Sequence, residues 1–303
     1  MNPPPTPSSP LTETEPKIMS ASTISPDLRV AAAQPALGKL SFARIVKSEW
    51  VKFTTIRSTL WGVALALVGG AGLAGLMAYA FLVGPSLDST LTAAEMFREI
   101  GDRPALALIG FDIKVTYALV AILGVLLIST ERASGLWNTT LVAVPSRTPA
   151  LTAKLLLSGV AGTVLGFVAA VATVLITAPT LAHYGFEQSL IDPILAQVVV
   201  GAAVFTGLIG VMSTAVASVV RSTAAGAGIV LGLFLIVPSI FGLIPGEFAA
   251  QLAQLLPGAA GMVLLQPVDT IGWSMLATSF LVFFGWVVAS VVLALVLLKR
   301  KDV

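Results

Sequence analysis

The sequence predicts an all-α polytopic membrane protein with six transmembrane helices. The chain has 303 residues, of which 56% are hydrophobic and only 11% are charged, whereas soluble domains carry about 25% charged residues. Its apolar residues run in continuous segments that reach about 20 residues, the length a helix needs to cross roughly 30 Å of hydrocarbon. The alternation of apolar and polar residues that marks a membrane β-barrel does not occur.

The first segment, residues 1–38, is rich in Pro, Ser, Thr and Ala and begins MNPPPTPSSPLTETEP. It lacks the basic start and apolar core of a signal peptide. Such a composition cannot bury enough apolar surface to offset the entropy of ordering the chain. We therefore expect a disordered cytoplasmic tail ahead of a membrane domain that covers residues 39–303.

Residues 40–57 predict an amphipathic helix that lies at the membrane surface, the interfacial helix, because a basic polar face stands opposite an aromatic apolar face. At 100° per residue the apolar face holds Phe42, Ile45, Val46, Trp50, Phe53 and Ile56, and the polar face holds Arg44, Lys47, Ser48, Lys52 and Thr55. Glu49 is the exception, because it projects into the apolar face. Its side chain either reaches out to water or pairs with a cation such as Arg57 or one from another cytoplasmic loop.

Six apolar segments predict the membrane spans, with approximate limits of 59–83, 107–129, 151–178, 194–220, 223–243 and 273–298. Residues 244–272, between the last two spans, are apolar but interrupted by Pro245, Pro257 and Pro267. A seventh span there would place Lys299–Lys301 on the outer side. A helical hairpin that enters the membrane from outside, the outer hairpin, fits better, since broken backbone is tolerated where protein buries it.

Asp112 and Lys114 interrupt the start of the second span. A charge at the centre of a bilayer costs about 2.5–3.5 kcal/mol on insertion scales. We expect both residues near the external interface, so that the hydrocarbon portion begins around Val115. The alternative is a buried ion pair on a substrate path.

The distribution of positive residues predicts that both termini are cytoplasmic. With the N-terminus inside, the cytoplasmic side receives Arg44, Lys47, Lys52, Arg57, Arg132, Arg147, Lys154, Arg221, Lys299, Arg300 and Lys301, and the outer side receives Arg98, Arg103 and Lys114.

Residues 129–154, between the second and third spans, form a charged and interrupted segment, the coupling loop. Glu131, Arg132 and Gly135 end the second span. Residues 136–144 are amphipathic and stop at Pro145, and Thr148-Pro149 restarts a helix with Thr148 as its N-cap. A short helix between two spans can act as a lever on both; the alternative is a loop that merely lies on lipid.

Catalytic motifs are missing from the chain. It has no cysteine, one histidine (His183), no phosphate-binding P-loop motif and no HExxH or GxSxG sequence. The basic residues follow the membrane topology, so nucleic-acid binding is not expected. Ion-coupled transport is disfavoured because the predicted spans lack an ionisable site at mid-membrane. If the protein moves a substrate, the energy comes from outside the chain.

Three segments resemble the membrane subunit of exporter-type ATP-binding-cassette transporters, the type-2 permeases, especially those of actinobacteria. They are Lys47–Lys52 with Thr55–Trp61; Ser129–Arg132 with Gly135, Thr139–Leu141, Pro145, Arg147 and Lys154; and the broken apolar hairpin before the last span. The second segment often has an aromatic residue where this chain has Arg132. The resemblance covers roughly residues 40–303.

The resemblance implies a subunit of the bacterial plasma membrane with no catalysis or cofactor of its own. It would pair with a second permease subunit, and a soluble P-loop ATPase that binds ATP and magnesium would dock on the coupling loop. The residues expected to couple the two are Glu131, Arg132, Gly135, Trp137, Pro145 and Arg147, and those expected to hold the interfacial helix are Glu49, Trp50, Lys52 and Arg57. The alternative function is a non-transporting scaffold or sensor in a membrane complex.

Overall fold

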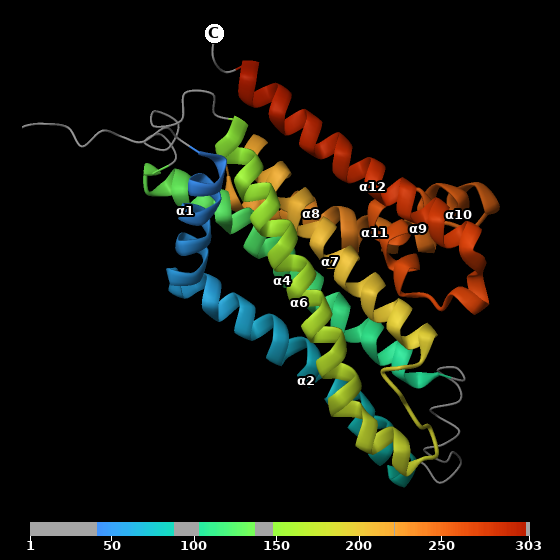
Figure 1. Cartoon of the computed structure of the whole chain (residues 1–303). Coiled ribbons are helices and arrows are strands. Elements are labelled where there is room, and N and C mark those ends of the chain that lie inside the picture. Colours follow the sequence, from blue (N-terminus) through green and yellow to red (C-terminus); the bar gives the residue numbers. More distant parts are fainter. Residues whose placement is uncertain (1–40, 88–102, 137–147, 221, 301–303) are drawn as a thin grey trace, which may run out of the picture. The chain divides into compact units, whose positions relative to one another are not determined.

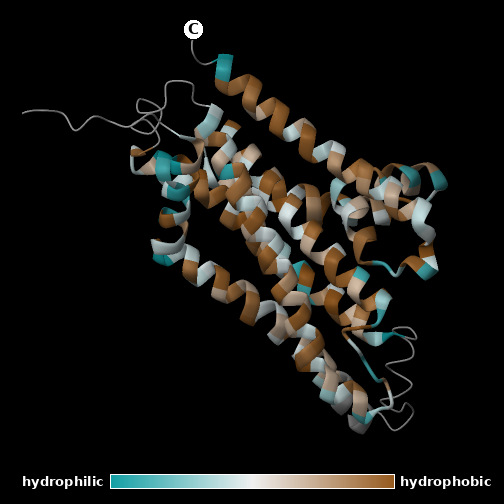
Figure 2. Ribbon diagram, viewed as in Figure 1, coloured by the Kyte–Doolittle hydropathy of each residue, from teal (hydrophilic) through white to brown (hydrophobic). Residues whose placement is uncertain are grey.

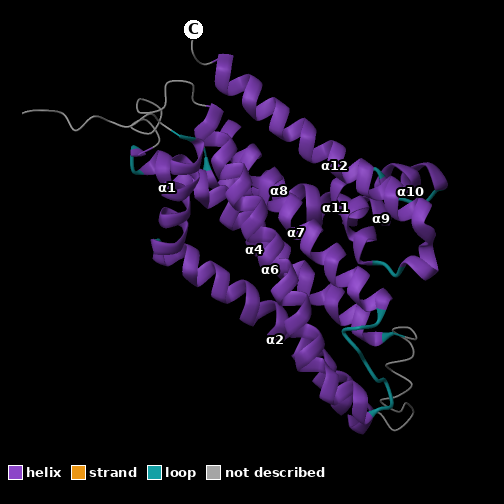
Figure 3. Ribbon diagram, viewed as in Figure 1, coloured by secondary structure: helices purple, strands orange, loops and turns teal. Residues whose placement is uncertain are grey.

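A computed structural model describes residues 41–87, 103–136, 148–220 and 222–300. Contacts divide the chain into two units, Met1–Leu40 and Ser41–Val303, and the predicted disordered tail lies outside the described residues. Throughout the described ranges the second unit is built from helices and short connections without strands (Figure 3). The predicted all-α class is therefore confirmed for this part of the chain.

Six helices of the described chain are long and apolar enough to cross a membrane (Figures 1 and 2). They are α2 (Arg57–Leu87), α4 (Pro104–Ala133), α6 (Thr148–His183), α7 (Pro193–Val219), the fifth segment formed by α8 (Thr223–Leu231), the π-helix η2 (Gly232–Ile236) and α9 (Val237–Leu243), and α12 (Val268–Arg300). Each coincides with one expected span. The helices indicate a multi-pass membrane protein.

Shorter helices occupy the two regions that were expected to flank the spans. Helix α1 (Phe42–Thr55) ends because Ile56 is extended, and α2 begins at the next residue. Between α9 and α12 lie α10 (Glu247–Gln254), α11 (Pro257–Met262) and the 3-10 helix η3 (Val263–Leu265). The chain bends by 70° between α10 and α11, and this bent pair would make a seventh span if it crossed as one.

Close backbone contact joins α6 to α7. A Cβ atom on Gly162 would lie 2.6 Å from the carbonyl oxygen of Thr206, and one on Gly166 would lie 1.8 Å from the Thr206 hydroxyl. The Thr206 hydroxyl donates to the carbonyl oxygen of Gly162 over 2.9 Å. Small residues here serve packing within the chain, because only they let the two backbones approach this closely.

An aromatic group joins the central helices to the last two spans. Tyr117 of α4 and Phe205 of α7 meet edge to face with 5.5 Å between ring centroids. Phe234 of η2 lies 6.1 Å from Phe283 of α12, and Phe283 lies 5.4 Å from Phe205. Such pairs contribute about 0.5–1.5 kcal/mol each beyond their buried area. They hold the fifth and sixth spans against α4 and α7.

Asp112 is fully buried between α2, α4 and α6. Its expected depth near the external interface stays a prediction, because burial against other helices does not fix a position across the membrane. Its two carboxylate oxygens accept hydrogen bonds from the hydroxyls of Thr116, over 2.9 Å, and Thr173, over 2.6 Å. Lys114 is exposed, with its ammonium 5.5 Å from the centroid of the Phe111 ring. The alternative of an Asp112–Lys114 ion pair is wrong, because the two side chains leave α4 in different directions.

Candidate functional site

Four charged side chains from three helices form a closed ring, which we call the charge ring: Glu49 and Lys52 of α1, Glu131 of α4 and Lys154 of α6. The Lys52 ammonium lies 2.7 Å from Glu49 Oε1 and 3.0 Å from Glu131 Oε1. The Lys154 ammonium lies 2.8 Å from Glu131 Oε1 and pairs directly with Glu49 Oε2. Each carboxylate therefore contacts both ammonium groups, and the four formal charges sum to zero.

Three members of the charge ring are withdrawn from solvent. The side-chain exposure is 0% for Lys154, 1% for Glu49 and 7% for Glu131, whereas Lys52 keeps 32%. Removing one member of a buried ion pair typically costs about 3–5 kcal/mol, because the remaining charge stays desolvated. Glu131 also has a buried carboxylate oxygen, Oε2, without a hydrogen-bond partner. The ring is stable only while its three helices keep their positions.

Helix α1 reaches the ring through one stripe of its surface. Ile45 is buried against Ala153 of α6, and Glu49 follows one turn later. Lys52, at the next turn, stands at the open side of the ring. Burial lowers the pKa of Lys52, but hydrogen bonds and charges from Glu49 and Glu131 outweigh this and raise the pKa above its ordinary value. Glu49 thus pairs with Lys52 and with Lys154, a cation from the expected coupling loop, which confirms that alternative, and not with Arg57.

Arg132, the neighbour of Glu131, holds a different helix end. Its guanidinium donates to the carbonyl oxygens of Ala217 over 2.9 Å and Val220 over 2.6 Å, and also to that of Ser218. These carbonyls belong to the last turn of α7, where helical partners run out. A cation there also opposes the negative end of the helix dipole. The last turn of α4 thus binds α1 and α6 through one residue and α7 through the next.

The described helices extend into the expected coupling loop, residues 129–154, from both sides. Helix α4 continues to Ala133, and α6 begins at Thr148, within one residue of the expected start. Gly135, with φ of 75°, ends the turn after α4 in a conformation that favours glycine. Trp137, Pro145 and Arg147 lie outside the described residues.

Two residues expected to hold the interfacial helix are not part of the ring. Trp50 is 51% exposed and stacks on Phe53, with 6.5 Å between ring centroids. Arg57 is exposed at the start of α2, and no ion pair joins it to another described residue. The exposed indole of Trp50 suits contact with lipid headgroups, whereas α1 is fixed by Glu49 and Lys52.

The sequence alone does not predict that Lys154 is buried. Because this lysine stands near the start of an apolar helix, its position in the sequence favours an anchor at the membrane surface. The available signal is Glu49, since a carboxylate on the apolar face of an amphipathic helix requires a buried partner. Over the described parts of the chain, no group of three or more His, Cys, Asp or Glu side chains could hold a metal ion.

Comparison with known proteins adds no family to this geometry. No protein-family model matches the chain, and no curated protein matches it. The six apolar helices indicate a multi-pass membrane protein. The likeness to type-2 permeases depends on the sequence segments quoted above.

Proposed function

We propose that the chain is the membrane subunit of an exporter-type ATP-binding-cassette transporter of a bacterial plasma membrane. A separate soluble ATPase would bind ATP and magnesium and hydrolyse the nucleotide. The observation that supports this most strongly is the charge ring. It bridges the two helix ends that flank residues 137–147, the segment on which the ATPase would dock.

The ring gives a physical route by which a push on this segment reaches other helices. Glu131 lies five residues from Leu136, the last described residue before the segment, and Lys154 lies six residues after Thr148. A displacement of either helix end changes the distance between Glu131 and Lys154. Because both side chains also bind α1, and Arg132 binds α7, such a displacement shifts four helices together.

The proposal places the charge ring and both chain ends on the cytoplasmic side, with α1 at the membrane surface. The exposed Trp50 and Phe42 of α1 would then contact lipid, while Ile45 and Glu49 pack on α6. The bent helices α10 and α11 would stand at the outer mouth of the transporter.

A second permease subunit would complete the pathway. In the fifth segment, a Cβ atom added to Gly228 or Gly232 would meet no other atom within 4 Å, so this face of small residues is not used for packing among the described residues. Small residues spaced by four along a membrane helix allow close approach of another helix. This face is our candidate for the contact between subunits.

Affinity purification of the tagged full-length chain from its native membrane tests the proposal. We expect a P-loop ATPase to co-purify and the complex to hydrolyse ATP. Gly135→Pro should reduce this hydrolysis or the recovery of the ATPase, because proline cannot adopt the positive φ of Gly135. Gly185→Pro is the matched control, since Gly185 has φ of 81° and follows the other end of α6.

Two results would contradict the proposal. Absence of any co-purifying ATPase removes the expected energy source. A complex that hydrolyses ATP but exports none of a panel of candidate substrates from vesicles favours the scaffold or sensor function. Equal activity of the Gly135→Pro and Gly185→Pro variants would contradict the role of the coupling loop alone.

A further inference from the structure

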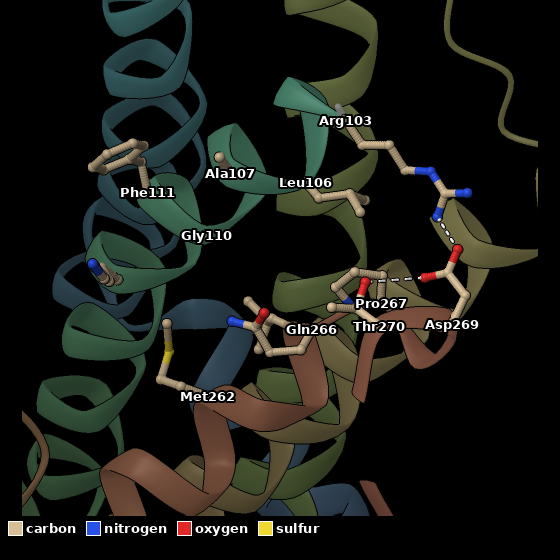
Figure 4. A pocket seen from close by; sticks show the side chains of 12 residues that line it. Arg103, Leu106, Ala107, Gly110, Phe111, Met262, Gln266, Pro267, Asp269 and Thr270 are labelled. Atoms are coloured by element: carbon tan, nitrogen blue, oxygen red, sulfur yellow. Dashed lines mark hydrogen bonds and ion pairs between the residues drawn. The ribbon is translucent and has the colours of Figure 1, made fainter. Parts of the chain in front are cut away.

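A cleft lies between the start of α4 and the start of α12, at the end of α4 opposite the charge ring (Figure 4). Its volume is about 680 Å³, within the range of roughly 300–1,000 Å³ that ligand sites occupy. One wall is a single face of α4 that includes Leu106, Gly110 and Phe111, and the facing wall includes Met262 and Leu265. We call this cavity the end cleft.

Three charged side chains from the described part of the chain line the end cleft, and their charges do not balance. Arg103 and Asp269 form an ion pair of 2.8 Å across the mouth, and both side chains are nearly half exposed. Lys114 lines the same cavity, and no carboxylate of a described residue lies within ion-pair distance of its ammonium. Among the described residues, the lining of the cleft therefore carries one uncompensated positive charge, which favours an anion.

The position of Lys114 along α4 brings its ammonium to the level of lipid headgroups if the charge ring lies at the opposite membrane surface. At 1.5 Å per residue, the 17 residues from Lys114 to Glu131 span about 25 Å of helix. If the charge ring stands at one surface of the hydrocarbon, which is about 30 Å thick, Lys114 stands about 5 Å inside the other surface. A lysine side chain reaches that far, so its ammonium comes level with lipid phosphates.

We propose that the end cleft binds an anionic phospholipid. The Lys114 ammonium would contact the phosphate, and Arg103 would add a second, partly neutralised contact nearer the mouth. The apolar residues Leu106, Met262 and Leu265 would contact the glycerol and the first carbons of the chains. Basic pockets between membrane helices recognise lipid headgroups through this combination of charge and apolar surface. The inference does not depend on the proposed ATPase partner.

Lipid retention by the purified full-length chain tests the assignment. The chain is exchanged into micelles that contain equal amounts of phosphatidylglycerol and phosphatidylcholine, and bound lipid is counted by native mass spectrometry. We expect one phosphatidylglycerol to be retained preferentially. Lys114→Gln should lower its retention about tenfold, the effect of losing one hydrogen bond to a charged group. Asp269→Asn should raise retention, because it frees the Arg103 guanidinium.

Lys47→Gln is the matched control, because it removes one exposed positive charge from α1 at the other end of the described chain. Equal loss of phosphatidylglycerol in the Lys47 and Lys114 variants would overturn the assignment, since net charge alone would then explain retention. So would equal retention of both lipids by the unaltered chain. A competition experiment compares inorganic phosphate with a short-chain phosphatidylglycerol as displacers of the bound lipid. If both displace it at the same concentration, the assignment is also overturned, because the apolar walls would then contribute nothing to binding.

Discussion

The carboxylate of Glu49 pairs with the ammonium of Lys154 across 105 residues of sequence, and both side chains are almost completely buried. Lys52 and Glu131 close the pair into a ring of alternating charge. A buried pair of this kind gives little net stability compared with apolar side chains of the same shape. Its main effect is to fix the relative positions of α1, α4 and α6, because these helices can move relative to one another only by separating desolvated charges.

Lys154→Met should destabilise the protein by about 3–5 kcal/mol, since it leaves Glu49 and Glu131 buried with only Lys52 as a partner. Thermal unfolding of the detergent-solubilised chain measures the change. Lys47→Met is the control, because Lys47 is exposed on α1 and should be nearly neutral. Similar melting temperatures for the two variants would show that the ring is not formed in the folded protein.

Combining Glu49→Gln with Lys154→Gln should recover part of the stability that either single change loses. The double variant keeps Lys52 and Glu131 as a balanced pair, at 3.0 Å in the unaltered chain. A double-mutant cycle therefore yields a coupling energy of about 0.5–3 kcal/mol, as expected for residues in direct contact. Additive losses would mean that the two side chains act independently.

Arg132→Lys should loosen the last turn of α7 while it preserves the positive charge. A lysine ammonium cannot present the planar fork with which Arg132 reaches the carbonyls of Ala217, Ser218 and Val220. Faster amide hydrogen exchange at the end of α7 is the expected result. Arg300→Lys, at the exposed end of α12, should leave that exchange unchanged.

The spans could be predicted from the sequence, and the ring could not. Continuous apolar composition is a local property, so the six segments appeared with limits close to those of the helices. The partners of Glu49 are a tertiary property, because nothing along the chain selects Lys154 rather than Arg57. The burial of Asp112 is a tertiary property for the same reason, because the hydroxyl that bonds its carboxylate belongs to Thr173, 61 residues away.

The contribution of Lys52 to stability should disappear at high pH. Burial opposes the charged form of Lys52, but Glu49 and Glu131 outweigh it and raise the pKa of Lys52 above 10.5 in the folded protein. A raised pKa means that the contribution is complete below the ordinary value of 10.5 and is lost as pH rises through the folded value. The difference in melting temperature between the unaltered chain and Lys52→Gln should be constant from pH 7 to about pH 10 and shrink above it. A difference that shrinks below about pH 9 would contradict the assigned partners.

Gly70→Ala should destabilise the protein although alanine favours helices, because Gly70 of α2 lies directly against Asp112. A Cβ atom there would lie 1.9 Å from Asp112 Oδ1 and 2.7 Å from the Thr116 hydroxyl, so either α2 or these hydrogen-bonded side chains must shift. Overpacking of this kind costs typically about 1–3 kcal/mol. The adjacent Gly69→Ala is a matched control, since its nearest side-chain atoms lie 3.9 Å away and the change should be neutral or stabilising. Adding Asp112→Ala to Gly70→Ala should relieve the collision, and thermal unfolding of the four variants measures the relief. If Asp112→Ala adds its own full cost to that of Gly70→Ala, the two residues are not in contact and the packing of α2 on α4 differs from the one described.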